Sequence, residues 1–242
     1  MILTNQNLSD YADWYENANF GEAFCLIDKE KDWTSFDVVA KVRGLTRIKK
    51  VGHAGTLDPL ATGLLILGFN KGTKRLAEFQ ELAKTYIANI KLGAKTKTDD
   101  SEAGEEDIKS TEHLNDDDIK IAVNAFIGKI EQIPPKYSAK KVHGKKLYQL
   151  ARKNQDVEIK STFVEICAIE IITIEKPFIR LKIDCSKGTY IRALARDIGE
   201  RLGVGGYLAD LRRTSIGNYN VDSALKISDL ADEVNKLKKD TK

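Results

Sequence analysis

The chain has 242 residues, of which 42% are hydrophobic and 31% charged, and its formal net charge is +3. This composition is typical of a soluble protein that buries the core of one large domain or two small ones. It excludes a membrane-spanning protein, because no apolar run is long enough to cross a bilayer, and the polar, acidic N-terminus is not a secretory signal.

The hydrophobic patterns predict a series of helices and strands. In chain order, the first half contains a short helix at 9–17, a strand at 23–27, a helix capped by Thr34 or Ser35, and strands at 64–69 and 85–92. An acidic loop follows, and then a helix capped by Asn115, strands at 163–174 and 178–185, and helices at 191–202 and 229–238. Because strands and helices do not alternate regularly, we expect an α+β fold with a mixed, largely antiparallel central sheet flanked by helices.

The histidines and cysteines do not form a metal-binding pattern. No two of the three histidines have the spacing of metal ligands, and Cys25, Cys167 and Cys185 fit no zinc motif. Cys167 and Cys185 lie in apolar, strand-like segments, so we expect both to be core residues. We therefore expect a cytoplasmic protein with no metal site, and the sequence contains no dinucleotide or phosphate-binding motif.

Charge is unevenly distributed along the chain. The segment 99–118 has ten acidic residues and one lysine, whereas 134–153 has seven Lys or Arg and no Asp or Glu. A basic block of this kind indicates contact with a polyanion. A solvated, lysine-rich surface loop is the alternative interpretation.

The segment 52–63, which reads GHAGTLDPLATG, carries one acidic residue in a turn rich in Gly and Pro. Gly55 permits backbone conformations closed to other residues, and Pro59 fixes the backbone directly after Asp58. A carboxylate held on a stiff turn at the start of a strand is well placed for nucleophilic chemistry. Taken alone, however, the segment favours an ordinary Asp-Pro turn over a catalytic carboxylate, because Asp and Pro most often form turns.

Five ordered segments together resemble the TruB-type tRNA pseudouridine synthases. The segment GHAGTLDPLATG is similar to the signature of this family. The others are CLIDKEKDWTSFDVV at 25–39, KTYIANIKLGAKTKTDDSEAGE at 84–105, PPKYSAKKVHGKKLYQLAR at 134–152, and CSKGTYIRALARDIG at 185–199 followed by LRRTSIGNY. The resemblance covers about residues 22–220 and implies the pseudouridine synthase fold, with 1–242 as one catalytic domain.

The resemblance implies that uridine 55 in the T-loop of tRNA is converted to pseudouridine without a cofactor. Asp58 is then the catalytic carboxylate, and Arg192, in the first turn of a predicted helix, is its matching cation. Tyr86 stacks on the flipped base, and His53 takes the place that the base vacates. From the sequence pattern alone, the alternative interpretation is that Tyr86 is a core tyrosine and that His53 is a turn residue.

The basic loop at 134–160 is then the RNA-contacting insertion. Its candidate phosphate contacts are Lys136, Lys140, Lys141, Lys145, Lys146, Arg152 and Lys153. Arg212 and Arg213 make phosphate or structural contacts. We expect the T-arm of tRNA as partner, no guide RNA, no membrane and a monomeric protein.

Two features depart from the family pattern. The usual Asp-Lys-Pro-x-Gly is here DKEKD at 28–32, so the turn made by Pro and Gly has to be formed otherwise, and no role is carried over to Lys29. Many members also have a small C-terminal RNA-binding domain, but only about twenty residues follow Tyr219 here, so we expect no such domain.

Two other functions are consistent with the same residues. One is a tRNA-binding folding helper in which catalysis is secondary. The other is a synthase of the same fold that acts on another RNA or through a guide. Activity on a bare T-arm stem-loop would exclude a guide, and an Asp58→Asn variant would separate isomerisation from assisted folding.

Overall fold

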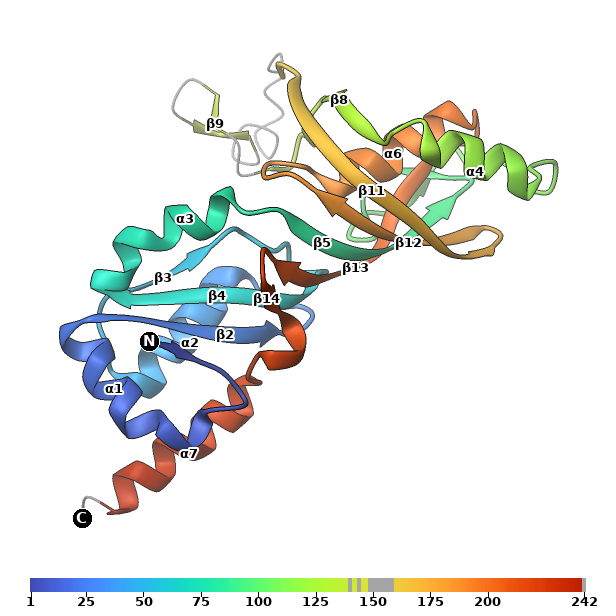
Figure 1. The fold of residues 1–242 in the computed structure, drawn as a ribbon. Coiled ribbons are helices and arrows are strands. Elements are labelled where there is room, and N and C mark those ends of the chain that lie inside the picture. The colour runs from blue at the N-terminus through green and yellow to red at the C-terminus, as the bar shows by residue number, and fades with distance from the viewer. Residues whose placement is uncertain (139–140, 143–144, 148–158, 241–242) are drawn as a thin grey trace. The chain divides into compact units, whose positions relative to one another are not determined.

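The computed structural model describes residues 1–138, 141–142, 145–147 and 159–240 (Figure 1). The chain divides into two compact units, Met1–Thr85 with Arg212–Lys242, and Tyr86–Leu211. Strand β13 (Gly206–Ile216) contributes residues to both units. The single catalytic domain over 1–242 stays a prediction.

The first unit is built on strands β1 (Ile2–Leu3), β2 (Glu22–Lys29), β4 (Thr62–Asn70) and the end of β13, in that order. β3 (Val51–Ala54) pairs with β4, and β14 (Tyr219–Asn220) pairs with β13. β1–β2 and β13–β4 are parallel, and the other pairs are antiparallel. The helical segments are η1 (Leu8–Asp10), α1 (Tyr11–Phe20), α2 (Ser35–Thr46), η2 (Lys71–Arg75), α3 (Leu76–Glu81), η3 (Val221–Ser223) and α7 (Ile227–Asp240).

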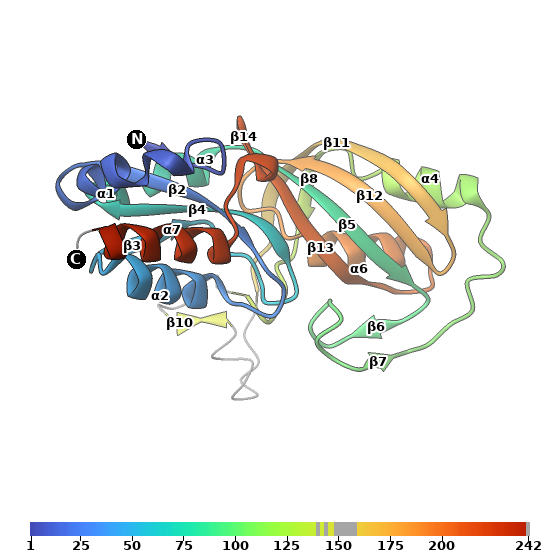
Figure 2. The ribbon, with the colours of Figure 1, turned by 90° about the horizontal axis from the view of Figure 1, so that it is seen from below.

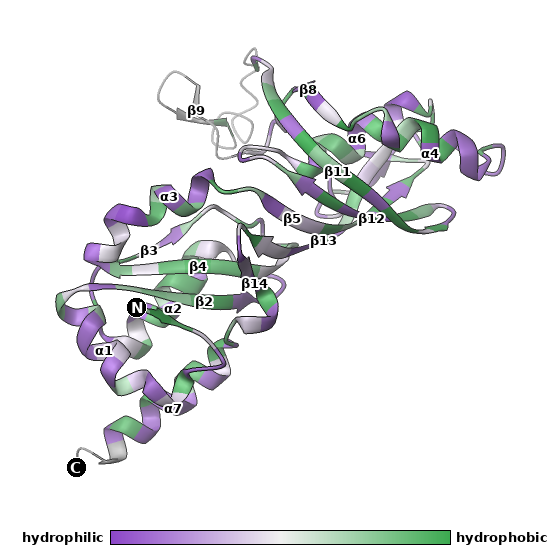
Figure 3. Ribbon diagram, in the orientation of Figure 1, coloured by the Kyte–Doolittle hydropathy of each residue, from purple (hydrophilic) through white to green (hydrophobic). Residues whose placement is uncertain are grey.

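Alternating side chains of β2 and β4 point into two different cores. Cys25 and Leu67 pack on one face with residues of α1, α2 and α7, whereas Leu26 and Ile66 pack on the other with residues of α3. Both faces of β4 are therefore apolar, as its colouring in Figure 3 shows. Helices α2 and α7 lie side by side and contact each other (Figure 2).

Helix α2 begins as its sequence predicts. The Thr34 hydroxyl accepts a hydrogen bond from the Asp37 N–H at 3.1 Å, and the Asp37 carboxylate accepts one from the Thr34 N–H at 2.9 Å. This reciprocal capping box satisfies two backbone donors that the first turn of a helix leaves without partners. The expectation of a cap at Thr34 is confirmed.

The second unit has the strand order β13, β5 (Lys84–Leu92), β12 (Phe178–Cys185), β11 (Thr162–Glu175) and β8 (Gly128–Gln132). The short pairs are β6 (Lys95–Thr96) with β7 (Glu105–Glu106), and β9 (Lys141–Val142) with β10 (Lys145–Lys146). Helix α4 (Asp116–Asn124) contacts α6 (Ile191–Arg201) and strand β11. Asn115 caps α4 as predicted, because its side chain accepts a hydrogen bond from the Asp118 N–H. The mixed, largely antiparallel sheet with flanking helices confirms the expected fold class.

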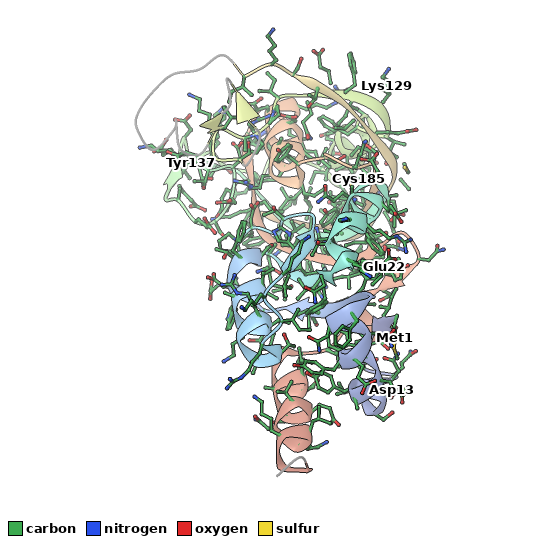
Figure 4. The ribbon with its side chains drawn as sticks, turned by 90° about the vertical axis from the view of Figure 1, so that its left-hand side faces the viewer. Met1, Asp13, Glu22, Lys129, Tyr137 and Cys185 are labelled. Carbon is green, nitrogen blue, oxygen red and sulfur yellow. The ribbon has the colours of Figure 1, made fainter. Side chains whose placement is uncertain are left out.

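The expectation that Cys167 is a core residue is wrong. Cys185 is buried (it is labelled in Figure 4), but Cys167 is exposed. From Phe163 to Cys167 the side chains of β11 alternate, with Val164 and Ile166 buried, so Cys167 lies on the outward face of the strand. The apolar character of the segment predicted a buried strand but did not show that one of its faces is exposed.

Candidate active site

Asp58 lies on the connection between β3 and β4, as the sequence predicts. The two strands form an antiparallel pair from Val51 with Phe69 to Ala54 with Ile66. Asp58 is half-buried, and its carbonyl accepts a hydrogen bond from the Ala61 N–H at 3.1 Å. At Gly63, with φ of +104°, a Cβ atom would lie 2.2 Å from the Arg213 carbonyl oxygen, so only glycine fits there.

Lys29 holds the turn directly beside Asp58. Its side chain is fully buried, and its Nζ donates hydrogen bonds to the carbonyls of Glu30 (2.9 Å), Trp33 (2.6 Å) and Pro59 (3.4 Å). Burial lowers the pKa of Lys29 from 10.5 to about 8, and the negative charge of Asp58 opposes this shift. Sequence reasoning assigned Lys29 no role, because the motif around it is altered.

Asp32 explains how that altered motif still forms its turn. It adopts a left-handed conformation with φ of +65°, which glycine adopts easily and which Asp tolerates better than most residues. Its N–H donates to the Pro59 carbonyl at 2.8 Å, so it ties the DKEKD segment to the Asp58 turn.

Arg213 holds the other side of the same turn. It is buried, its Nε donates to the Leu64 carbonyl at 2.8 Å, and its Nη2 donates to the Gly55 carbonyl at 3.2 Å. The neighbouring Arg212 forms a two-pronged ion pair with Asp28, at 3.0 and 2.7 Å. We expected Arg212 and Arg213 to contact either phosphates or the protein itself, and the structure shows the contacts within the protein.

His53, the third residue of β3, is half-buried beside an exposed aromatic ring. Its imidazole meets the ring of Phe36 edge to face, with centroids 5.5 Å apart. Burial lowers the His53 pKa below 6.5, and Arg213 adds to the effect while a contact with the Gly55 backbone opposes it. The imidazole is therefore neutral at pH 7, and its buried Nδ1 has no hydrogen-bond partner among the described residues.

Arg192 lies in the first turn of α6, in the second unit, as predicted. Its Nη1 is 3.2 Å from the Asp100 carboxylate, and the two side chains are 6% and 1% exposed. It also donates to the carbonyls of Thr98 at 3.1 Å and Tyr137 at 2.9 Å (Tyr137 is labelled in Figure 4). Asp58 lies in the other unit, and its pairing with Arg192 stays a prediction.

Asp100 was missed by sequence reasoning, which treated it as part of an acidic loop. One of its carboxylate oxygens accepts hydrogen bonds from the Thr98 hydroxyl at 2.5 Å and the Glu102 N–H at 3.0 Å. The neighbouring Asp99 pairs with Arg196 at 3.0 Å, and burial raises the Asp99 pKa. The start of the acidic segment therefore supplies internal counter-charges rather than a solvated surface.

The structure describes some of the remaining predicted site residues and leaves others outside its described ranges. Tyr86 lies on the buried side of β5, and its stacking on a base stays a prediction. Lys136 is exposed, and the backbone of Lys141, Lys145 and Lys146 forms β9 and β10. Lys140, Arg152 and Lys153 lie outside the described residues, so RNA contact by this insertion stays a prediction.

Two features are absent from the part of the chain that the structure describes. Its His, Cys, Asp and Glu side chains include no group of three that could hold a metal ion. Among the same residues, no helix is long and apolar enough to span a membrane.

Comparison with known proteins decides the family. The model of the N-terminal domain of TruB family pseudouridylate synthases matches residues 43–191. The chain belongs to this family. The model of the C-terminal domain of tRNA pseudouridylate synthase B matches 192–242, which runs from α6 through α7.

Two relatives named tRNA pseudouridine synthase B have similar sequences. The chain is 49% identical to tRNA pseudouridine synthase B of Chloroherpeton thalassium over 218 residues, which is 87% of this chain and 90% of the relative. It is 48% identical to the protein of the same name from Phocaeicola vulgatus over 217 residues, which is 86% of this chain and 92% of the relative.

Solved structures share the fold. A chain in the crystal structure of a Cbf5-Nop10-Gar1 complex matches with a TM-score of 0.72 and 26% identity over 95% of this chain. A chain in the structure of an H/ACA RNP bound to a substrate RNA matches with a TM-score of 0.68 and 25% identity over 90%. The matches span only 59% and 55% of those two chains.

Proposed function

We propose that this TruB-family protein converts the uridine at position 55 of the tRNA T-loop to pseudouridine. The reaction breaks the C–N glycosidic bond, turns the base over and joins its carbon C5 to the ribose. We further propose that the protein acts in the cytoplasm as a monomer, without a guide RNA. The observation that carries the proposal is the placement of Asp58, half-exposed on a turn held by two buried cations.

The rigid turn favours Asp58 as the catalytic carboxylate. Lys29 and Arg213 bind backbone carbonyls at Gly55, Pro59 and Leu64, which lie on both sides of Asp58. Because these carbonyls are fixed, the carboxylate loses little conformational freedom when it reaches the transition state. The positive charge of Lys29 favours the ionised form of Asp58, the form required of a nucleophile or charge stabiliser.

The other residues of the site have supporting roles in this proposal. Arg192 stabilises negative charge at the reacting centre, Tyr86 stacks on the extruded base, and His53 fills the space that the base leaves. A neutral His53 suits this position, because an uncharged ring brings no charge that would have to be desolvated among stacked bases.

Release of tritium from a T-arm stem-loop labelled at C5 of its uridines tests the proposal. Formation of pseudouridine replaces the C5 hydrogen, so each turnover releases one label. We expect release by the wild type in the presence of a chelator, none by Asp58→Asn, and normal release by Asp13→Asn, a change of an exposed residue on α1. If the wild type and Asp58→Asn both bind the RNA but the wild type releases no tritium, a folding helper or another RNA substrate would be favoured instead.

A further inference from the structure

Residues 132–138, which form the entry segment of the basic loop, are fixed beside the start of α6. The Oε1 atom of Gln132 accepts a hydrogen bond from the Tyr190 N–H at 2.8 Å, and its Nε2 donates to the Tyr190 carbonyl at 3.1 Å. Gln132 is buried and ends β8, and Tyr190 is the N-cap residue of α6. The entry segment therefore starts from a fixed point at the end of the helix.

Two arginines of α6 hold the entry segment further along. Arg192 donates from Nη2 to the Tyr137 carbonyl at 2.9 Å, and Arg196 donates from Nη2 to the Ile133 carbonyl at 3.0 Å. The two arginines are about one helical turn apart, so they lie on one face of α6. The carbonyls that they bind follow in the reverse order, so the entry segment runs antiparallel to the helix and is held near both ends.

Two prolines make the entry segment stiff between these points. Pro134 and Pro135 are both buried, and their rings fix two successive φ angles. Lys136 follows them directly, and its side chain is exposed. A displacement of the backbone at Ile133 is therefore carried on to Lys136, because the residues between them cannot absorb it by bending.

Arg196 is itself held in one orientation by two carboxylates. Its Nη1 is 3.0 Å from the Asp99 carboxylate, and its Nε and Nη2 bind the Asp197 carboxylate at 2.9 and 2.8 Å. The side chains of Arg196 and Asp99 are 20% and 17% exposed, so water weakens their attraction less than at the surface. The charge of Arg196 is therefore compensated within the protein, and the same rigid guanidinium presents a donor to the Ile133 carbonyl.

We infer that Arg196 is a positioning residue, which sets the place of Lys136 through the Ile133 carbonyl so that Lys136 contacts a phosphate of the substrate RNA. The inference rests on the proposed function, because it takes the neighbouring Arg192 as part of the reacting centre. In this role Arg196 strengthens RNA binding without touching RNA, whereas a purely structural residue would change the stability of the protein alone.

Replacement of Arg196 by lysine tests the inference, because lysine keeps the positive charge but lacks the planar fork that binds both carboxylates and the carbonyl. We expect the KM for a T-arm stem-loop to rise about tenfold, which corresponds to about 1.4 kcal/mol, with kcat unchanged. Arg201→Lys is the matched control and should behave as the wild type, since Arg201 is exposed in the last turn of the same helix.

A second variant changes the orientation of Arg196 from the other side. Asp99→Asn removes the charge that holds Nη1, while asparagine tolerates the left-handed backbone at this position, where φ is +59°. The KM should rise in this variant as well. Unfolding in urea, measured for each variant, separates a loss of positioning from a loss of fold.

A double variant shows whether Arg196 acts through Lys136. Lys136→Gln alone should reduce the slope of log K against log salt by about 0.7 to 0.9, as for the loss of one phosphate contact. Arg196→Lys should reduce the slope by a similar amount although it changes no charge. The variant that carries both substitutions should bind the RNA no more weakly than either single variant.

The outcomes separate this inference from the proposed function. If the wild type releases tritium while Arg196→Lys and Asp99→Asn keep its KM and salt slope, the inference is overturned and the proposed function stands. Additive losses in the double variant would also overturn the inference, because Arg196 would then not act through Lys136. If the wild type binds the RNA but releases no tritium, the proposed function alone is refuted, since the salt slopes and the double variant are measured by binding.

Discussion

Replacement of Asp100 by alanine should destabilise the second unit far more than the loss of an ordinary ion pair. Asp100 and Arg192 are separated by 3.2 Å and are 1% and 6% exposed. Lys97 and Glu106, in the same unit, are also separated by 3.2 Å but are 71% and 52% exposed. The two pairs share their distance and differ in burial, so Glu106→Ala is a matched control.

The expected magnitudes follow from burial. Removing one partner of a buried pair leaves an uncompensated charge away from water and costs about 3 to 5 kcal/mol. The Thr98 hydroxyl and the Glu102 N–H also lose an acceptor in Asp100→Ala. The exposed pair contributes about 0 to 1 kcal/mol, because water screens both of its charges. A loss of 3 kcal/mol or more is a large part of the stability of a typical domain.

The assay is urea unfolding followed by far-UV circular dichroism. Both tryptophans of the chain, Trp14 and Trp33, lie in the first unit, so their fluorescence reports mainly on that unit. Dichroism reports on both units, and a transition seen by dichroism alone would be assigned to the second. Similar losses of unfolding free energy in Asp100→Ala and Glu106→Ala would refute the reasoning.

Three further changes probe the turn of Asp58 and helix α2. The contribution of Lys29 to the free energy of unfolding should rise between pH 8 and 10.5, because the unfolded chain keeps a proton that Lys29, with a pKa of about 8, has released. Urea unfolding of the wild type and of Lys29→Met at each pH should show this rise as a growing difference between the two proteins. Arg213→Lys should cost about 1 to 3 kcal/mol in thermal unfolding, because one ammonium cannot reproduce both guanidinium contacts with Gly55 and Leu64. Thr34→Ala should cost about 1 kcal/mol, and Thr34→Ser much less, because serine keeps the capping hydroxyl.

Each of these predictions has a contradicting result. An unchanged pH dependence in Lys29→Met would mean that the buried amine is not responsible for the rise. Wild-type stability in Arg213→Lys would mean that the two carbonyls find other donors. Equal losses in Thr34→Ala and Thr34→Ser would assign the effect to something other than the cap.

The sequence by itself determined the features that depend on neighbouring residues. The capping box at Thr34, the alternation of β5 and the position of Arg192 in the first turn of α6 were all predicted, because caps and periodicities span only a few residues. The family, and with it the fold class and the candidate Asp58, followed from short segments in their order along the chain.

Only the tertiary structure decided which polar residues are buried together. Arg192 binds Asp100 and Thr98, and Arg213 binds the carbonyls of Gly55 and Leu64, far away along the sequence. The exposure of one face of β11, which includes Cys167, and the left-handed Asp32 that takes the place of glycine were equally hidden. In each case the arrangement depends on burial and on partners that the fold brings close together. No local pattern in the sequence therefore predicts it.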